Sequence, residues 1–265
     1  MTDFHTHSLF SGDADDTLEN MVRAAIRAGC RYLCPTEHCN LDFARNRIDI
    51  EPSDLDGYAA EFARLRTKYA GQIRLTYGIE LGYDMHCKSD YADIVKKYRF
   101  EYVINSTHLI DGEDCYHGYF DRYDVKTAFT NYLKAVRDSL DAPYRFDTVG
   151  HFGYVARNCP YENVDMYTAA PDLADDILKT MISRGVCLEA NSSVRRAPQP
   201  CLPAANVLKR YRELGGESIV FGSDAHRTGD LFRSRSAVIE HLRNVGFKYH
   251  TVWDEGKKIQ LKIEN

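Results

Sequence analysis

Two histidines near the start of the chain, His5 and His7, are separated by a single residue. On an extended strand, side chains two positions apart point to the same face, so both imidazoles can reach one point in space. Asp13 follows a turn at Ser11-Gly12 and is close enough to add a carboxylate oxygen. These residue types predict a metal site, provided that the rest of the chain brings further ligands to the same place.

Other predicted strands also end in a histidine or a carboxylate. In chain order, the strands over 32–38, 73–81, 102–108, 146–151 and 218–222 lead to His38, Glu80, His108, His151, and the pair Asp224 and His226. Six of the ten histidines therefore lie at strand ends. The other four, His86, His117, His241 and His250, fall outside the pattern, and we expect them at the surface. His117 is expected nearest to a substrate, because it lies in a long polar loop over 109–123 that could form the rim of a site.

Helical patterns alternate with these strands. We expect helices near 16–29, 54–69, 88–98, 124–140, 173–184, 203–214 and 234–244. With a further strand over 186–191, this makes seven strand–helix units. Such alternation predicts a parallel sheet, and seven or eight units in about 250 residues predict closure into a barrel with its active site at the carboxyl ends of the strands. No compositional break marks a linker, so we expect a single domain over 1–265.

Composition excludes several classes of protein. The net charge of −5 argues against a nucleic-acid partner, because proteins that track phosphate backbones usually carry a basic excess. No apolar run of about eighteen residues and no export signal occur, so we expect no membrane contact and a cytoplasmic location. The eight cysteines show no Cys-x-x-Cys pair and are expected to be reduced thiols. The oligomeric state is left open.

The predicted ligand set is too large for one ion. It comprises His5, His7, Asp13, His38, Glu80, His108, His151, Asp224 and His226. A catalytic zinc ion usually takes three protein ligands, so this set predicts two or three divalent ions, and zinc, iron and manganese all suit mixed imidazole and carboxylate ligands. Because the ions would carry more charge than the carboxylates neutralise, the centre favours a phosphate ester as substrate.

Short motifs at these strand ends resemble, in order and spacing, those of the polymerase and histidinol phosphatase (PHP) superfamily. They are His5-Thr6-His7, Thr36-Glu37-His38, Gly78-Ile79-Glu80, Ser106-Thr107-His108, Gly150-His151 and Gly222-Ser223-Asp224-Ala225-His226. The resemblance covers nearly the whole chain. Two further segments resemble the monofunctional histidinol-phosphate phosphatases in particular. They are Leu188-Glu189-Ala190-Asn191 with the arginines that follow, and Leu214-Gly215-Gly216 before the last motif.

This resemblance implies a distorted (β/α)7 barrel of the PHP type with a trinuclear metal centre. It places His5, His7, Glu80 and Asp224 on a first ion, with Glu80 bridging to a second held by His108 and His151; Asp13, His38 and His226 would hold a third. Some members have histidine where this chain has Asp13. Aspartate can also bind an ion, but the difference means that occupancy of the third ion position does not follow from the resemblance alone.

The implied reaction is hydrolysis of L-histidinol phosphate, a small phosphomonoester, in histidine biosynthesis. Glu80, Asp224 and His226 are the expected catalytic residues, with Asp224 or His226 as the acid for the leaving group. Arg157, Arg195 and Arg196 follow strand ends and could clamp the phosphate, and the resemblance favours Arg157 and Arg196.

Three alternatives stay open at this point. One is another PHP phosphoesterase that acts on a different small phosphate ester, such as a nucleotide. A second is a metal-dependent amidohydrolase, a class that also begins with a His-x-His strand but would want a lysine where this chain has Thr107-His108. The third is a metal-binding protein without catalytic activity.

Overall fold

The computed structural model of the chain describes residues 1–41, 53–161, 164–194 and 200–263. Its main sheet contains parallel strands that neighbour one another in the order β1, β2, β4, β5, β8, β9, β10. Their bounds are β1 (Thr2–Thr6), β2 (Tyr32–Cys39), β4 (Gly78–Gly82), β5 (Tyr102–Ser106), β8 (Thr148–Val149), β9 (Cys187–Asn191) and β10 (Ile219–Gly222). A short strand, β3 (Arg74–Leu75), pairs with β2 beside this path.

The first and last strands of this order meet and close the sheet into a barrel. Thr6 and Ala225 form a parallel bridge. The amide of Asp224 donates to the carbonyl of His5 at 2.7 Å, and the amide of His7 donates to the carbonyl of Ala225 at 2.8 Å. The barrel departs from the regular eight-stranded form, and its strand β8 has only two residues. The predicted fold class, a distorted (β/α)7 barrel, is confirmed.

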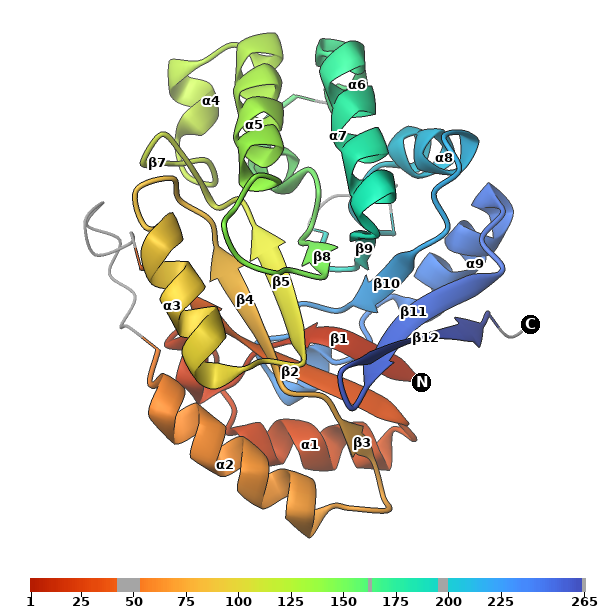
Figure 1. Cartoon of the computed structure of the whole chain (residues 1–265). Helices are drawn as coiled ribbons and strands as arrows, with labels where there is room; N and C mark the ends of the chain where they lie inside the picture. Colours follow the sequence, from red (N-terminus) through yellow and green to blue (C-terminus); the bar gives the residue numbers. More distant parts are fainter. Residues whose placement is uncertain (42–52, 162–163, 195–199, 264–265) are drawn as a thin grey trace.

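Helices surround the strands in a ring (Figure 1). Several begin at a residue whose side chain accepts a hydrogen bond from the first turn, as Thr17, Asp54 and Asp124 do. The described helices are α1 (Leu18–Arg27), α2 (Leu55–Lys68), α3 (Lys88–Tyr98), α4 (Tyr119–Arg122), α5 (Val125–Ser139), α6 (Met166–Ala169), α7 (Pro171–Arg184), α8 (Ala205–Glu213) and α9 (Arg235–Val245). None of these has both the length and the apolar character needed to cross a bilayer.

Apolar side chains form two outer cores between strands and helices. One packs α5, α7 and α8 against β9 and β10, and the other packs α1, α2 and α3 against β2 and β4. This amphipathic pairing of strand and helix is what fixes the strands in register, so that their carboxyl ends lie together on one side of the barrel.

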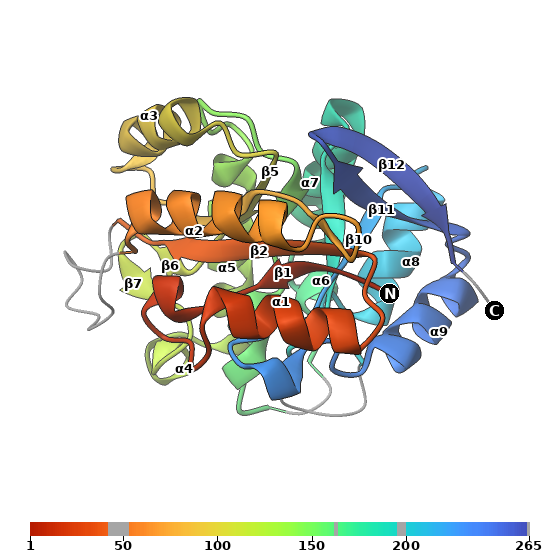
Figure 2. The same cartoon turned by 90° about the horizontal axis from the view of Figure 1, so that it is seen from below.

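A third apolar cluster lies inside the barrel, because it joins side chains from strands on opposite sides, including Phe4 of β1 and Tyr102 of β5. A hairpin of β11 (Tyr249–Asp254) and β12 (Lys257–Lys262) adds Trp253, whose ring centroid is 4.5 Å from that of Tyr102. Tyr102 begins its strand, so the hairpin covers the amino ends of the strands (Figure 2). A site in this barrel must therefore open at the other end.

Two local expectations need correction. The strand expected over 73–81 is divided into β3 and β4, because the amide of Tyr77 donates to the Glu101 side chain at 2.8 Å instead of to a neighbouring strand. The segment 109–123, expected to be a loop, contains α4 and a hairpin of β6 (Leu109–Ile110) and β7 (Glu113–Asp114). Asp111-Gly112 forms its two-residue turn with positive φ at both positions, which is a recognisable hairpin signal.

Candidate metal centre

Ligand-type side chains converge at the carboxyl ends of the barrel strands. The strands carry or shortly precede them in this order: His5 and His7 (β1), His38 (β2), Glu80 (β4), His108 (β5), His151 (β8), Asp224 and His226 (β10). Asp13 joins them from the segment after a 3-10 turn, η1 (Leu9–Ser11). Barrel closure thus gathers residues from both ends of the chain, and all nine predicted ligands lie within the described residues.

The first group lies at the seam between β1 and β10. The Nε2 atoms of His5 and His7 are 3.3 and 3.6 Å from Glu80 Oε2. The same two nitrogens are 3.8 and 3.3 Å from Asp224 Oδ1. Two imidazole nitrogens and two carboxylate oxygens therefore surround one point, as the sequence predicts for a first ion.

The second group shares Glu80 with the first. Glu80 Oε1 lies 2.9 Å from His151 Nε2 and 3.4 Å from His108 Nε2, and these two nitrogens are 3.2 Å apart. Because Oε2 of the same carboxylate faces His5 and His7, Glu80 is oriented to bridge two neighbouring positions.

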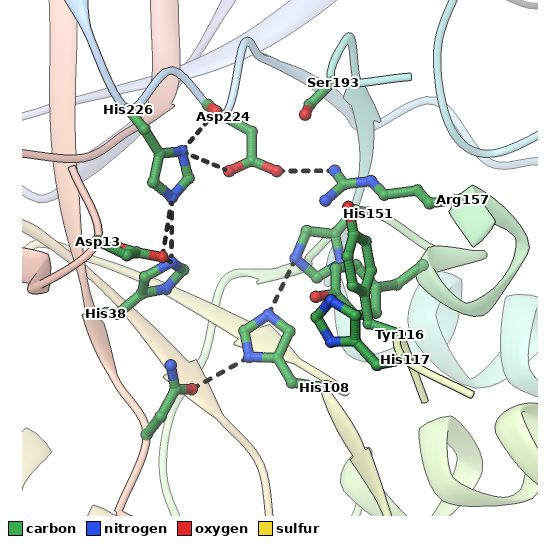
Figure 3. A pocket seen from close by; sticks show the side chains of 12 residues that line it. Asp13, His38, His108, Tyr116, His117, His151, Arg157, Ser193, Asp224 and His226 are labelled. Carbon is green, nitrogen blue, oxygen red and sulfur yellow. Dashed lines mark hydrogen bonds and ion pairs between the residues drawn. The ribbon is translucent and has the colours of Figure 1, made fainter. Parts of the chain in front are cut away.

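The third group is the most exposed (Figure 3). Asp13 Oδ2 lies 3.4 Å from the Nε2 atoms of both His38 and His226, and these nitrogens are 3.3 Å apart. The side chains of Asp13 and His226 are 32% and 30% exposed, against 0% for Glu80. The three predicted ligands of a third ion are thus close together, at the mouth of the site.

Unpaired buried atoms indicate that these groups suit cations. Donor atoms of His5, His7 and Glu80 lie within 4.8 Å of one another, as do those of Glu80, His108 and His151. Within the described part of the chain, His5 Nε2 and His7 Nε2 are buried and form no well-aligned hydrogen bond, and imidazole nitrogens surround the buried Glu80 Oε2, with His38 Nδ1 at 2.6 Å. Leaving such a group unsatisfied costs about 1–3 kcal/mol. Divalent ions would take these lone pairs, so the residues fit two or three such ions.

The carboxylates of the site are held in the charged form. Burial alone would raise the pKa of Glu80, but the neighbouring imidazoles, first those of His5 and His38, lower it well below its usual range. Burial is likewise outweighed at Asp224, where His5 and then Arg157 lower the pKa. Both carboxylates are therefore available as anionic ligands at neutral pH.

The pKa values of His7 and His38 are shifted in opposite directions, because different charges surround the two buried rings. Burial and then the nearby His38 hold the pKa of His7 well below its usual value, so His7 stays neutral and keeps a lone pair. At His38, burial is outweighed by Glu80 and Asp13, which raise the pKa to about 10. An ion bound by His38 must therefore displace a proton, which couples ion binding at the third position to pH.

The ligand cluster forms one wall of a cavity of about 340 Å³, a size that suits a small molecule (Figure 3). The residues that line it are Asp13, His38, Asn40, His108, Tyr116, His117, His151, Tyr154, Arg157, Ser193, Asp224 and His226. Six of the nine predicted ligands thus face this space.

Arg157 is the one predicted substrate arginine within the described residues; Arg195 and Arg196 lie outside them. Its side chain is 9% exposed and lines the cavity from the 3-10 helix η2 (Tyr154–Asn158). Nη2 donates to Asp224 Oδ2 at 2.7 Å and to Asn191 Oδ1 at 2.9 Å. The guanidinium is thereby held beside the first and second ligand groups.

Several lining residues were not predicted from the sequence. Tyr116 and Tyr154 stack with their ring centroids 5.4 Å apart, and Asn40 Oδ1 lies 3.1 Å from His108 Nδ1. The length of the 109–123 segment indicated a rim, but no residue pattern indicated which of its side chains turn inward. His117 lines the cavity, whereas the expectation that His250 is a surface residue is wrong, because His250 is buried.

Comparison with known families agrees with this geometry. The model of the PHP domain matches residues 3–193, which is more than half of the chain. The chain belongs to the PHP domain family. The resemblance seen in the strand-end motifs is confirmed.

Curated relatives of this PHP domain extend over most of the chain. A probable histidinol-phosphatase from Clostridium acetobutylicum is 28% identical over 248 residues, covering 93% of this chain and 94% of the relative. A histidinol-phosphatase from Lactococcus lactis is 28% identical over 227 residues, covering 84% of this chain and 83% of the relative.

A solved structure is similar over nearly the whole PHP domain. The histidinol phosphate phosphatase from Lactococcus lactis, crystallised with zinc, L-histidinol and phosphate, superposes with a TM-score of 0.88 at 26% identity. The alignment covers 97% of this chain and 98% of that enzyme. The fold is thus shared along nearly the whole chain, including most of the segment beyond residue 193.

Proposed function

We propose that this PHP domain hydrolyses L-histidinol phosphate to L-histidinol and phosphate, a step of histidine biosynthesis. The observation that carries the proposal is the convergence of nine imidazole and carboxylate side chains beside Arg157, on a barrel that superposes on an enzyme crystallised with zinc, L-histidinol and phosphate. A cation cluster next to a buried guanidinium is suited to a phosphate dianion.

Three ligand sets would hold the ions. His5, His7, Glu80 and Asp224 form the first, Glu80, His108 and His151 the second, and Asp13, His38 and His226 the third. When bound, the ions supply Lewis-acid stabilisation of phosphoryl oxygens and lower the pKa of water to make a nucleophile near neutral pH. Glu80 keeps the first two positions adjacent through its two oxygens.

Arg157 would bind and orient the phosphate. Its guanidinium is fixed by Asp224 and Asn191 and keeps further N–H donors for phosphoryl oxygens. Arg195 and Arg196 remain predictions for the same role. Because Asp224 accepts from Arg157 and faces His7, it joins the phosphate-binding side of the site to the first ion position.

His226 is the better placed of the two candidate acids. Its side chain is 30% exposed in the cavity, against 5% for Asp224, and its pKa is raised because the bond to Asp13 and the charge of Asp224 outweigh burial. It would donate a proton to the leaving alkoxide. This role applies with two ions bound, because a histidine that ligates a third ion has no proton to give from the bound nitrogen.

The organic half of the substrate would lie against the aromatic wall. Tyr116 and His117 line the cavity across from Asp13, His38 and His226 (Figure 3). Tyr154 also lines the cavity and stacks with Tyr116. His117 Nδ1 lies 2.8 Å from Asp114 Oδ2, which orients the imidazole of His117 at the rim. A planar ring can stack on such a surface, as the imidazole of histidinol would.

We also propose that residues 1–265 form one domain in the cytoplasm. The family match ends at residue 193, but Asp224 and His226 belong to the same cluster as His5 and Glu80, and the β11–β12 hairpin packs into the same barrel. All eight cysteines are buried free thiols, which suits a reducing compartment.

A side-by-side assay tests the function. Zinc-loaded protein with counted ions would be given L-histidinol phosphate, a nucleoside monophosphate and an aryl phosphate at equal concentrations. We expect kcat/KM to be highest for L-histidinol phosphate by at least about tenfold, which corresponds to about 1.4 kcal/mol of discrimination. Equal rates on all three, or a preference for the nucleotide, would reject the substrate; no release of phosphate from any of them would reject the reaction.

A further inference from the structure

Two buried carboxylates lie next to the ligand cluster without belonging to the predicted ligand set. Glu189 on β9 is 1% exposed and Glu37 on β2 is 0% exposed. Neither lines the cavity. A buried charged group is costly unless it is paired, so each must have a structural or chemical reason to be there.

Glu189 contacts two of the histidines. Its Oε1 lies 2.6 Å from His5 Nδ1, and its Oε2 accepts a hydrogen bond from the backbone amide of His151. Oε1 also accepts from Asn191 Nδ2, and Oε2 accepts from the His151 amide, so the carboxylate acts as an acceptor and the hydrogen of the first contact is on Nδ1 of His5. This leaves Nε2 as the ion-binding nitrogen, and Nε2 is the atom that faces Glu80 Oε2 at 3.3 Å.

The packing around Glu189 supports this assignment. Gly222 on β10 lies against the pair, and a Cβ at that position would collide with Glu189 Oε1 and come within 2.6 Å of the Cβ of His5. Asn191 Nδ2 also donates to Glu189 Oε1 at 3.1 Å. The carboxylate is therefore held against the imidazole from two sides.

Glu37 acts on His7 through a serine. Ser11 Oγ lies 2.6 Å from Glu37 Oε2 and 3.1 Å from His7 Nδ1. The hydroxyl has a single hydrogen, which it donates to Glu37 Oε2, so it must accept from Nδ1 of His7. Ser8 completes the network, because its amide and hydroxyl donate to the two oxygens of Glu37 at 2.9 and 2.6 Å.

We propose that Glu189 and Glu37 are positioning residues that fix His5 and His7 as Nδ1–H tautomers, with both Nε2 lone pairs directed at the first ion position. The inference rests on the proposed metal centre and adds to it the groups that pre-orient its ligands. Glu189 acts directly and Glu37 acts through Ser11, so the loss of Glu189 has the larger effect. Outer partners of this kind set ion affinity as well as ring orientation.

Zinc affinity tests the proposal. We expect Glu189→Gln and Glu37→Gln to weaken zinc binding by about 10- to 100-fold in competition with a chelator, with Glu189→Gln the weaker binder. Asp147→Asn is the matched control: Asp147 is a mostly buried carboxylate at the start of β8, bonded to the Val103 amide at 2.9 Å and away from the ligands. It should keep the affinity of the unmodified protein.

NMR of the unmodified protein tests the tautomers of His5 and His7 directly and does not depend on whether a variant folds. Long-range proton–nitrogen NMR of the zinc-loaded protein should show hydrogen on Nδ1 and the ion on Nε2 for His5 and His7. Hydrogen on Nε2 of either histidine would overturn the proposal, as would unchanged zinc affinity in folded Glu189→Gln. If the unmodified protein binds no zinc, the metal centre itself fails; if it binds zinc and turns over substrate while Glu189→Gln binds equally well, only this inference fails.

Discussion

Arg157 is the most constrained cation of the site. A guanidinium that is 9% exposed, shared between Asp224 and Asn191, and stacked 5.0 Å from the Tyr154 ring has little freedom to move. Such a group is oriented before substrate arrives, and pre-orientation reduces the entropy lost on binding. Its proximity to Asp224 also means that its removal could disturb an ion ligand, so the two effects must be measured separately.

Removing Arg157 should weaken phosphate binding. We expect Arg157→Ala to raise KM for the phosphate ester by about 10- to 100-fold, because a charge-assisted hydrogen bond contributes about 1.5–3 kcal/mol. Zinc content, measured on the same sample, should stay unchanged. Arg145→Ala is the control, since Arg145 lies before β8 and donates to the carbonyl of Phe100 instead. A parallel loss of zinc and activity would instead assign Arg157 to the support of Asp224.

The ligands could be predicted from the sequence because their positions follow from the strand pattern. A histidine or carboxylate at the end of a predicted parallel strand, such as His38 or Glu80, must lie at the end of the barrel where the active site forms. Tyr116 and Tyr154 offered no such signal, since they lie in irregular segments whose direction depends on packing. Glu37 stands next to His38 in sequence, and only its contacts with Ser8 and Ser11 reveal that it faces away from the cavity.

At the scale of elements, the β11–β12 hairpin carries a buried histidine. His250 is 5% exposed, and its Nδ1 lies 3.5 Å from Thr2 Oγ1. Burial, and then the positive charges of Arg235 and the chain's amino terminus, lower the pKa of His250 to about 4. The hairpin therefore tolerates His250 only in its neutral form, and its attachment to the barrel becomes sensitive to acid.

Acid should weaken the fold through this residue. The pKa of His250 is lower in the folded than in the unfolded state. The stability that the neutral side chain permits is therefore fully present above about pH 6.5 and is lost as the pH falls toward about 4. We expect the free energy of unfolding to fall by up to about 3 kcal/mol more in the unmodified protein than in His250→Gln over this range. Urea titrations of zinc-free protein at both pH values measure the difference. Equal losses would contradict the assignment.

The elements could be predicted where the signal was local. Asp54 and Gly185 bound α2 and α7 as expected, because a cap acts within one turn. The β11–β12 hairpin could not be predicted, because it is held by contacts between residues distant in sequence. Trp253 packs against Phe4 and Tyr102, which no local pattern around Trp253 indicates. The hairpin turn at Asp111-Gly112 could have been predicted, because an Asp-Gly pair favours a two-residue turn; the expectation of a loop over 109–123 was wrong there.

On the scale of the whole molecule, the ion positions join distant parts of the chain. The first group takes His5 and His7 from the first barrel strand and Asp224 from the end of the last one. The seam between these strands depends on few backbone bonds, notably Asp224 to His5 and His7 to Ala225. An ion bound there contacts both sides of the seam. It should therefore stabilise the closed barrel against unfolding.

Removing the ions should lower the melting temperature. Zinc at about 100 times its Kd would contribute about 2.7 kcal/mol, which corresponds to about 5–10 °C for a chain of this size. Calorimetry with and without a chelator measures the shift, and added zinc should reverse it whereas calcium should not. A melting temperature that ignores the chelator would argue against ions at the seam.

The closure of the barrel by its first and last strands has a consequence for synthesis. During synthesis, His5 and His7 are made before Asp224 and His226, because more than two hundred residues separate the two pairs. Until Asp224 is made, the two histidines can meet Glu80 but not the second carboxylate of the first ion position. A product truncated before β10 would therefore lack both the barrel seam and a complete first ion position.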